Sequence, residues 1–121
     1  MSTHTILVVD DDADIRASLC DLLEDEGYAV ATAAHGRDAL DYLRGHPAPS
    51  VVLLDLMMPT MDGYEFRAEQ KRDPTIAAIP VVVMTARGTV EPGLDVEQIL
   101  QKPLKLPKLR DALQRALTRP R

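Results

Sequence analysis

The sequence predicts an α/β fold, a three-layer sandwich built on a parallel sheet, and three observations support this fold class. Short apolar runs rich in β-branched residues recur along the chain, as expected of strands buried on both faces. Helical patterns separate these runs, and neither internal repeats nor a linker interrupts the alternation. The 121 residues, 45% apolar and 27% charged, suit one soluble domain. We therefore predict a single domain over residues 1–121, with a core of about residues 4–118.

The first half of the chain is predicted to hold three strands and two helices. Its strands are the runs at residues 5–9, 29–33 and 51–54, of which the second is the weakest. The first helix follows Asp12, a good N-cap residue, and ends near Gly27, which suits a helix C-terminus. A second, short helix at residues 36–45 stops at a proline-rich stretch.

The second half repeats the alternation less regularly. The expected elements are a turn at residues 60–63, a helix at 64–72, strands at 80–84 and 99–101, and a final helix that Pro107 can open. Residues 87–97 form the least regular segment, because Gly88, Pro92 and Gly93 allow a turn or two of helix at most.

Composition limits the classes of function. The formal net charge of −5 argues against a non-specific nucleic-acid binder. Cys20 is the only cysteine, so no intramolecular disulfide can form and the chain fits a reducing compartment. The N-terminus lacks the features of a signal peptide, and no apolar run approaches the ~20 residues of a membrane-spanning helix. We expect a cytoplasmic protein that neither inserts into a membrane nor contacts nucleic acid directly.

Polar residues end four of the predicted strands. In a parallel sheet the carboxyl ends of all strands face the same rim, which is also where open α/β sheets bind their ligands. The residues gathered there are Asp10, Asp11, Asp55, Thr85 and Lys102. Three carboxylates at one rim repel one another, so they must either raise their pKa values or bind a cation.

The residue types at this rim favour Mg²⁺ and phosphoryl chemistry. Carboxylate oxygens with room for water suit Mg²⁺, whereas no Cys or His is placed to supply the softer ligands of zinc. Asp55 is the only acid that closes the central strand, which makes it the best-fixed nucleophile. A carboxylate can accept a phosphoryl group when cations screen the incoming charge. Lys102 supplies a point charge for this, and Thr85 a hydroxyl donor.

Each of these residues alone also has an ordinary explanation. Asp55 can end a strand or cap the turn before Pro59, since aspartate is a common turn former. Asp10 and Asp11 can favour the positive end of the next helix, and Lys102 can be a solvated surface lysine. The functional interpretation rests on all of them meeting at one rim.

Taken as a set, these residues resemble the receiver domain of two-component response regulators, a family that includes the chemotaxis receiver. The resemblance covers nearly the whole chain, and its spacing is specific although no single motif would be. It rests on Val8-Val9-Asp10-Asp11, on Leu54-Asp55 with Met58-Pro59 and Asp62-Gly63, on Met84-Thr85-Ala86, and on Lys102-Pro103.

The resemblance implies a flavodoxin-like sheet of five strands in the order 2-1-3-4-5, with Asp55 as the phosphoacceptor. Thr85 and Lys102 would hold the phosphoryl group, and the Lys102–Pro103 peptide bond would be cis. The donor would be a phosphohistidine on a sensor histidine kinase or a histidine phosphotransfer protein. The phosphorylated receiver would change conformation and so control a downstream protein target.

The resemblance also implies a metal site made of oxygen ligands. Asp11 would bind Mg²⁺ directly and Asp10 partly through water, while Asp55 and the backbone carbonyl of Met57 would complete the site. Mn²⁺ would be able to substitute for Mg²⁺.

The chain departs from the usual receiver pattern between Thr85 and Lys102. Only 16 residues separate them, so the fourth helix of the family is expected to be short or irregular. Ile99 stands where receivers often carry an aromatic residue that rotates inward on activation, which puts the usual threonine–aromatic switch in doubt. We therefore do not carry over the family's usual dimerisation face.

Two residues are expected to set the lifetime of the phosphoryl group. In the family these are the residues two after the phosphoacceptor and two after the threonine, here Met57 and Arg87. Met57 cannot orient an attacking water by hydrogen bonding, and Arg87 could cover the phosphoryl group or pair with it. We predict slow autodephosphorylation, over minutes or longer.

The sequence bears on three rival functions. A haloacid-dehalogenase-type phosphatase needs a second Asp two residues after its nucleophile, where this chain has Met57, so turnover as an enzyme is not expected. A flavodoxin-like cofactor binder would place a phosphate against Asp10, Asp11 and Asp12, which repel it. A pseudo-receiver that docks partners without phosphorylation stays an alternative. The sequence leaves open whether the protein is a stand-alone regulator or part of a longer one.

Overall fold

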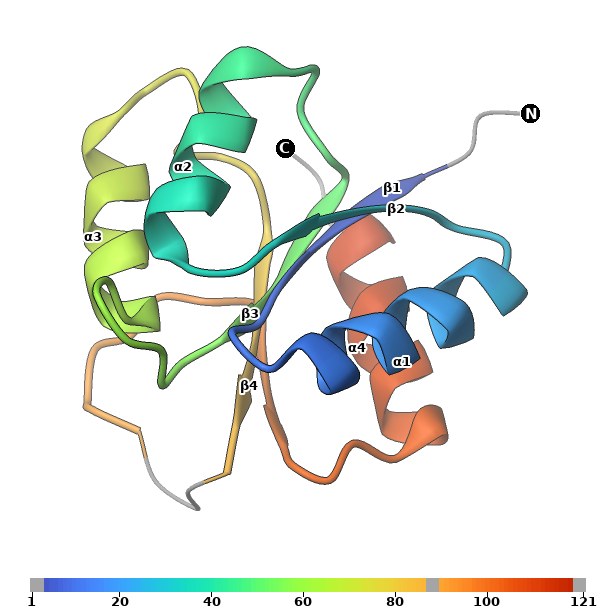
Figure 1. Cartoon of the computed structure of the whole chain (residues 1–121). Coiled ribbons are helices and arrows are strands. Elements are labelled where there is room, and N and C mark those ends of the chain that lie inside the picture. Colours follow the sequence, from blue (N-terminus) through green and yellow to red (C-terminus); the bar gives the residue numbers. More distant parts are fainter. Residues whose placement is uncertain (1–3, 87–89, 119–121) are drawn as a thin grey trace.

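The computed structural model describes residues 4–86 and 90–118, and within them the chain forms five strands and four helices (Figure 1). In chain order the elements are β1 (Thr5–Val9), α1 (Ala13–Asp25), β2 (Ala29–Ala33), α2 (Gly36–Gly45), β3 (Val51–Asp55), α3 (Gly63–Arg72), β4 (Val81–Thr85), β5 (Gln98–Gln101) and α4 (Leu106–Thr118). These bounds agree with the predicted elements to within one or two residues at most ends.

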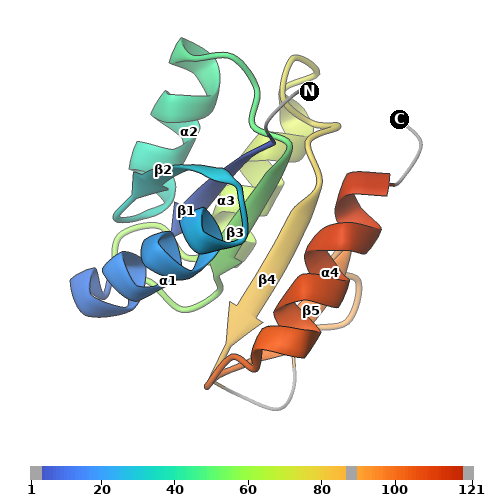
Figure 2. The same cartoon turned by 90° about the vertical axis from the view of Figure 1, so that its right-hand side faces the viewer.

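The sheet has the strand order β2-β1-β3-β4-β5, and all four neighbouring pairs are parallel. This confirms the predicted fold class and strand order. Helices α2 and α3 cover one face of the sheet, while α1 and α4 cover the other (Figures 1 and 2). The fold is the predicted three-layer sandwich.

The core has two halves, one on each face, because successive side chains of a strand point to opposite sides of the sheet. In β3, Val52 and Leu54 join the cluster beneath α2 and α3, whereas Val51 and Leu53 join the cluster beneath α1 and α4. Every residue of β3 and β4 is buried, as expected of central strands in a parallel sheet. Asp55 is thereby fixed at the end of a fully packed strand.

Helix starts are set by side-chain caps. The side chain of Asp12 accepts hydrogen bonds from the first-turn amides of α1, as predicted. Asp62 and Glu65 form a reciprocal capping box at the start of α3. His35 caps α2 by accepting from the amide of Asp38, a role that the sequence analysis missed. None of the four helices is both long and apolar enough to cross a membrane.

The connection from β4 to β5 is the irregular part of the fold. Residue 86 and residues 90–97 contain no helix, in agreement with the predicted loss of a regular fourth helix (Figure 1). We call residues 90–97 the strap. Its apolar residues Val90, Leu94 and Val96 pack against the core beneath α2 and α3.

Candidate functional site

The candidate site lies at the rim where β1, β3, β4 and β5 end. Asp10 follows β1, Asp55 and Thr85 are the last residues of β3 and β4, and Lys102 follows β5. Neighbouring strand ends are joined by backbone hydrogen bonds, including one from the Lys102 amide to the Thr85 carbonyl, with an N···O distance of 2.8 Å. The predicted residues therefore share one rim, as the parallel topology requires.

Asp10 is fully buried, and each of its polar atoms has a hydrogen-bond partner. Its carboxylate accepts from the Asp12 amide at 2.9 Å and from the Lys102 ammonium at 3.0 Å. Its backbone amide donates to the carbonyl of Ala33, and its own carbonyl accepts from Arg16 at 2.7 Å. Asp10 is thus held in one orientation.

Lys102 links Asp10 to Asp55. Its ammonium nitrogen lies 3.0 Å from one carboxylate oxygen of Asp10 and 3.4 Å from one of Asp55. The other oxygen of Asp55 accepts from the Met57 amide at 3.3 Å. The lysine predicted to meet a phosphoryl group therefore already neutralises part of the acidic cluster.

Burial and like charge raise the pKa of Asp55 to about 6. Burial of the carboxylate is the larger cause and the charge of Asp10 the next, while Lys102 and the Met57 amide oppose the shift. For Lys102, burial works against the charge, but hydrogen bonding and attraction from the two carboxylates outweigh it and raise the pKa of the ammonium. Of the two predicted responses to crowded acids, Asp55 shows a raised pKa.

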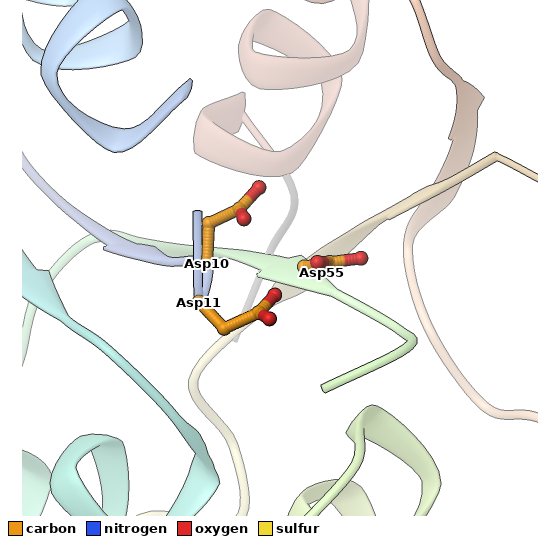
Figure 3. Close-up of side chains that lie close together, drawn as sticks. All are labelled: Asp10, Asp11 and Asp55. Atoms are coloured by element: carbon orange, nitrogen blue, oxygen red, sulfur yellow. The ribbon is translucent and has the colours of Figure 1, made fainter. Parts of the chain in front are cut away.

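The three carboxylates suit a single Mg²⁺ ion. One oxygen atom from each of Asp10, Asp11 and Asp55 lies within 4.8 Å of the others (Figure 3). Asp10 and Asp55 are buried and fixed, whereas Asp11 is exposed and leaves room for the water ligands that Mg²⁺ retains. The donor set is all oxygen and therefore fits Mg²⁺ or Mn²⁺ better than zinc.

The loop after Asp55 folds back closely on its own start, where the Gly63 amide donates to the Leu56 carbonyl at 2.8 Å. Thr60 adopts a positive φ of 70°, an uncommon conformation for a β-branched residue. A Cβ atom added to Gly63 would lie 2.8 Å from the Leu56 Cα atom, so only glycine fits at that position. This loop is held by backbone contact.

A cavity of about 360 Å³ adjoins the rim on the α3 side. Met57 is 46% exposed and lines it, so its side chain presents only apolar atoms and sulfur to this space. The lining residues are Leu56, Met57, Asp62, Tyr64, Thr85, Val90 and Glu91. The strap thus borders the site as well as α3.

The remaining predicted residues are Ile99, Arg87 and Pro103. Ile99 is 44% exposed on β5, opposite Val83 of β4, and Arg87 lies outside the described residues. The Lys102–Pro103 bond is cis, the isomer that the resemblance implies. Cys20 is half-buried, and burial is the first cause that raises the pKa of its thiol.

Sequence reasoning missed two residues near the site. Arg16 holds the carbonyl of Asp10 from α1, and Tyr64 binds the strap from α3. A cation in the first turns of a helix that follows three acids could have drawn attention to Arg16. No local pattern marks Tyr64, because its partner Glu91 is 27 residues away.

The fold and the rim together define a class: a flavodoxin-like α/β domain with a cluster of carboxylates and a lysine at the carboxyl ends of its strands. The family model described as the response regulator receiver domain matches residues 6–114. The chain belongs to this family.

Individual relatives agree with the assignment. The chain is 44% identical over 119 residues to response regulator MprA of Mycolicibacterium vanbaalenii, covering 94% of this chain and 50% of that protein. It is 42% identical over 85 residues to response regulator Rre1 of Synechocystis sp., covering 69% of this chain and 36% of that protein. The chain therefore spans half or less of the length of these curated relatives.

Solved structures show the same fold. The chemotaxis response regulator CheY4 of Vibrio cholerae is 30% identical and superposes with a TM-score of 0.86, covering 96% of this chain and all of that one. The structure of FixJ-N is 27% identical with a TM-score of 0.85, covering 100% of this chain and 98% of that one.

Proposed function

We propose that this chain is the phosphoacceptor of a two-component phosphorelay and takes a phosphoryl group from a phosphohistidine onto Asp55. The observation that carries the proposal is the position of Asp55, buried at a strand end between an acidic pair and Lys102. A carboxylate oxygen of Asp55 would attack phosphorus as the phosphorus–nitrogen bond breaks, forming an acyl phosphate and leaving the donor imidazole free.

Residues of this chain would neutralise the negative charge of the phosphoryl oxygens during the transfer to Asp55. Mg²⁺ held by Asp10, Asp11, Asp55 and the carbonyl of Met57 would screen the incoming phosphoryl oxygens. Lys102 would pass from its carboxylate partners to the phosphoryl oxygens, and its short distances to both acids support this role. Thr85 would donate its hydroxyl from the end of β4.

Labelling with a small donor tests the proposal. Incubation with acetyl phosphate and Mg²⁺, followed by intact-mass measurement, should add one phosphoryl group to the wild-type protein and none to Asp55→Asn. Chelation of Mg²⁺ should prevent the addition. An unmodified wild-type protein would instead favour a receiver that docks partners without phosphorylation.

The donor protein can meet the chain along α1. A groove of about 600 Å³ runs between α1 and the segment after β5, and Lys102 lies on its edge. The lining residues are Asp14, Ile15, Ser18, Leu19, Leu22, Lys102, Pro103 and Leu104. A largely apolar groove beside the site suits a helix that carries the donor histidine.

Blocking this groove should affect transfer from a phosphohistidine protein but not labelling by the small donor acetyl phosphate. We expect Ser18→Arg, at an exposed position in the groove, to slow transfer from a phosphohistidine protein at least tenfold and to leave labelling by acetyl phosphate unchanged. Ala17→Arg, exposed on the same helix but outside the groove lining, is the matched control. Equal transfer to both variants would place the donor elsewhere.

The phosphoryl group should be long-lived. Met57 offers no hydrogen bond to an attacking water, so we expect autodephosphorylation of the isolated, Mg²⁺-bound protein to take minutes or longer. Met57→Asn should shorten the lifetime, because an amide can orient water. A wild-type lifetime of seconds, measured by loss of the phosphoryl mass, would refute this prediction.

The protein would act as a switch and not as a turnover enzyme. The phosphoryl group adds roughly two negative charges at Asp55, and Thr85 and Lys102 would be drawn toward it. We expect the conformational response mostly in residues 87–97 and a cytoplasmic downstream protein as the target. Within the longer proteins that it resembles, such a domain would control whatever else the chain carries.

A further inference from the structure

The strap is held against α3 by side chains. Arg67 donates from its Nε atom to the carbonyl of Asp95 at 2.7 Å, and Lys71 lies 3.2 Å from the Asp95 carboxylate. Nearer the site, the backbone amide of Glu91 donates to the hydroxyl oxygen of Tyr64 at 2.9 Å. The Tyr64 contact therefore joins α3 to the strap at two residues that share a cavity with Thr85 and Met57.

Tyr64 and Glu91 stand between two cavities. Both residues line the cavity of about 360 Å³ that also contains Thr85 and Met57, and both line a second cavity of about 280 Å³ beside Arg67. The hydrogen bond between them therefore lies where the two cavities adjoin, and displacement of either residue would reshape both.

Phosphorylation would act on this bond from both of its ends. Thr85 and Tyr64 line the same cavity, so movement of Thr85 toward a phosphoryl group on Asp55 would change the surroundings of the Tyr64 side chain. Glu91 is an exposed acid on the same cavity, so about two added negative charges would repel it. Both effects would strain the hydrogen bond between Tyr64 and Glu91.

We propose that Tyr64 is a positioning residue for the phosphorylation response: its hydroxyl holds the strap on α3 in the unphosphorylated protein and releases Glu91 when Asp55 is phosphorylated. This inference rests on the proposed function of Asp55. It assigns the response to an aromatic residue on α3 and to the strap, whose described residues 90–97 form no helix. Arg67 and Lys71 keep the outer end of the strap attached, so the release is local to residues near Glu91.

Hydrogen exchange at the Glu91 amide tests the proposal, because this amide is the donor of the bond. In wild-type protein, treatment with acetyl phosphate and Mg²⁺ should speed its exchange at least tenfold, as measured by NMR. In Tyr64→Phe the amide should already exchange at the faster rate, and phosphorylation should add less than a twofold change. Tyr42→Phe removes the hydroxyl of an equally half-buried tyrosine on α2, outside both cavity linings, and should behave as wild type.

The outcomes are distinguishable from failure of the proposed function. Intact mass, recorded on the same samples, reports whether Asp55 carries the phosphoryl group; absence of that adduct in wild type overturns both proposals. An adduct with unchanged Glu91 exchange overturns the role of Tyr64 alone. If Tyr64→Phe lowers stability yet keeps the tenfold response to phosphorylation, the hydroxyl is merely structural and the inference is wrong.

Discussion

The two connections that flank the site are held in different ways. The loop from β3 to α3 is fixed by the close approach of Gly63 to the backbone of Leu56 and by the capping box at the start of α3. The connection from β4 to β5 has no helix in its described part and is held by the side chains of Tyr64, Arg67 and Lys71. The first connection directly follows Asp55, the proposed phosphoacceptor, and we expect the second to rearrange more easily than the first.

The largest expected difference between the two connections lies in their glycines. Gly63→Ala should lower the free energy of unfolding by about 3 kcal/mol, because its Cβ would meet the Leu56 backbone at 2.8 Å. Gly93→Ala should cost only about 1 kcal/mol, since the strap has open space there and only the positive φ of 86° is strained. Urea unfolding measures both changes. Equal losses would show that the strap is as rigid as the loop after β3.

The next largest effect concerns the loss of stability that results from burying the Asp55 carboxylate at the end of β3, where the first connection begins. Its pKa of about 6 in the folded protein exceeds the ordinary value of 3.8, so the folded state retains a proton that the unfolded state has lost between these pH values. Stability should therefore fall as pH rises from about 4 to 6 and stay lowered above that range. With Mg²⁺ chelated at pH 7, Asp55→Asn should be more stable than wild type by about 2 kcal/mol.

Two controls check the origin of this gain. The advantage of Asp55→Asn should shrink as pH falls and approach zero well below pH 3.8, where the wild-type carboxyl is protonated in both states. Adding Mg²⁺ at pH 7 should stabilise wild type more than the variant, because only wild type keeps the third carboxylate. Unfolding curves that show no gain at pH 7 would contradict the assigned pKa direction.

The smallest effect tests strain in the loop after β3. Thr60 has a φ of 70°, so Thr60→Gly should raise the free energy of unfolding by up to about 1 kcal/mol. Thr60→Ser removes the methyl group but keeps a side chain at the same φ, and it should gain less. A loss of stability in Thr60→Gly would mean that the methyl group packs usefully and that the conformation is not strained.

The sequence predicted most of the fold, because the strands are short apolar runs with clear stops. The sequence also predicted which side chains meet at the site, since a parallel sheet places the carboxyl ends of all its strands at one rim. These are Asp10, Asp11, Asp55 and Lys102. The contacts of Arg16 and Tyr64 could not, because they depend on where helices sit against distant segments. Sequence patterns report which face of a helix is apolar but not which distant backbone group a polar side chain will reach.

The hydrogen bond from the Lys102 amide to the Thr85 carbonyl has a consequence for timing. The two side chains expected to bind the phosphoryl group belong to residues whose backbones are directly hydrogen-bonded, so we expect their movements to be coupled. Binding of the phosphoryl group by either side chain should displace the strand end that carries the other. We therefore expect Thr85 and Lys102 to bind it in one concerted step, without a populated intermediate in which only one of them is bound.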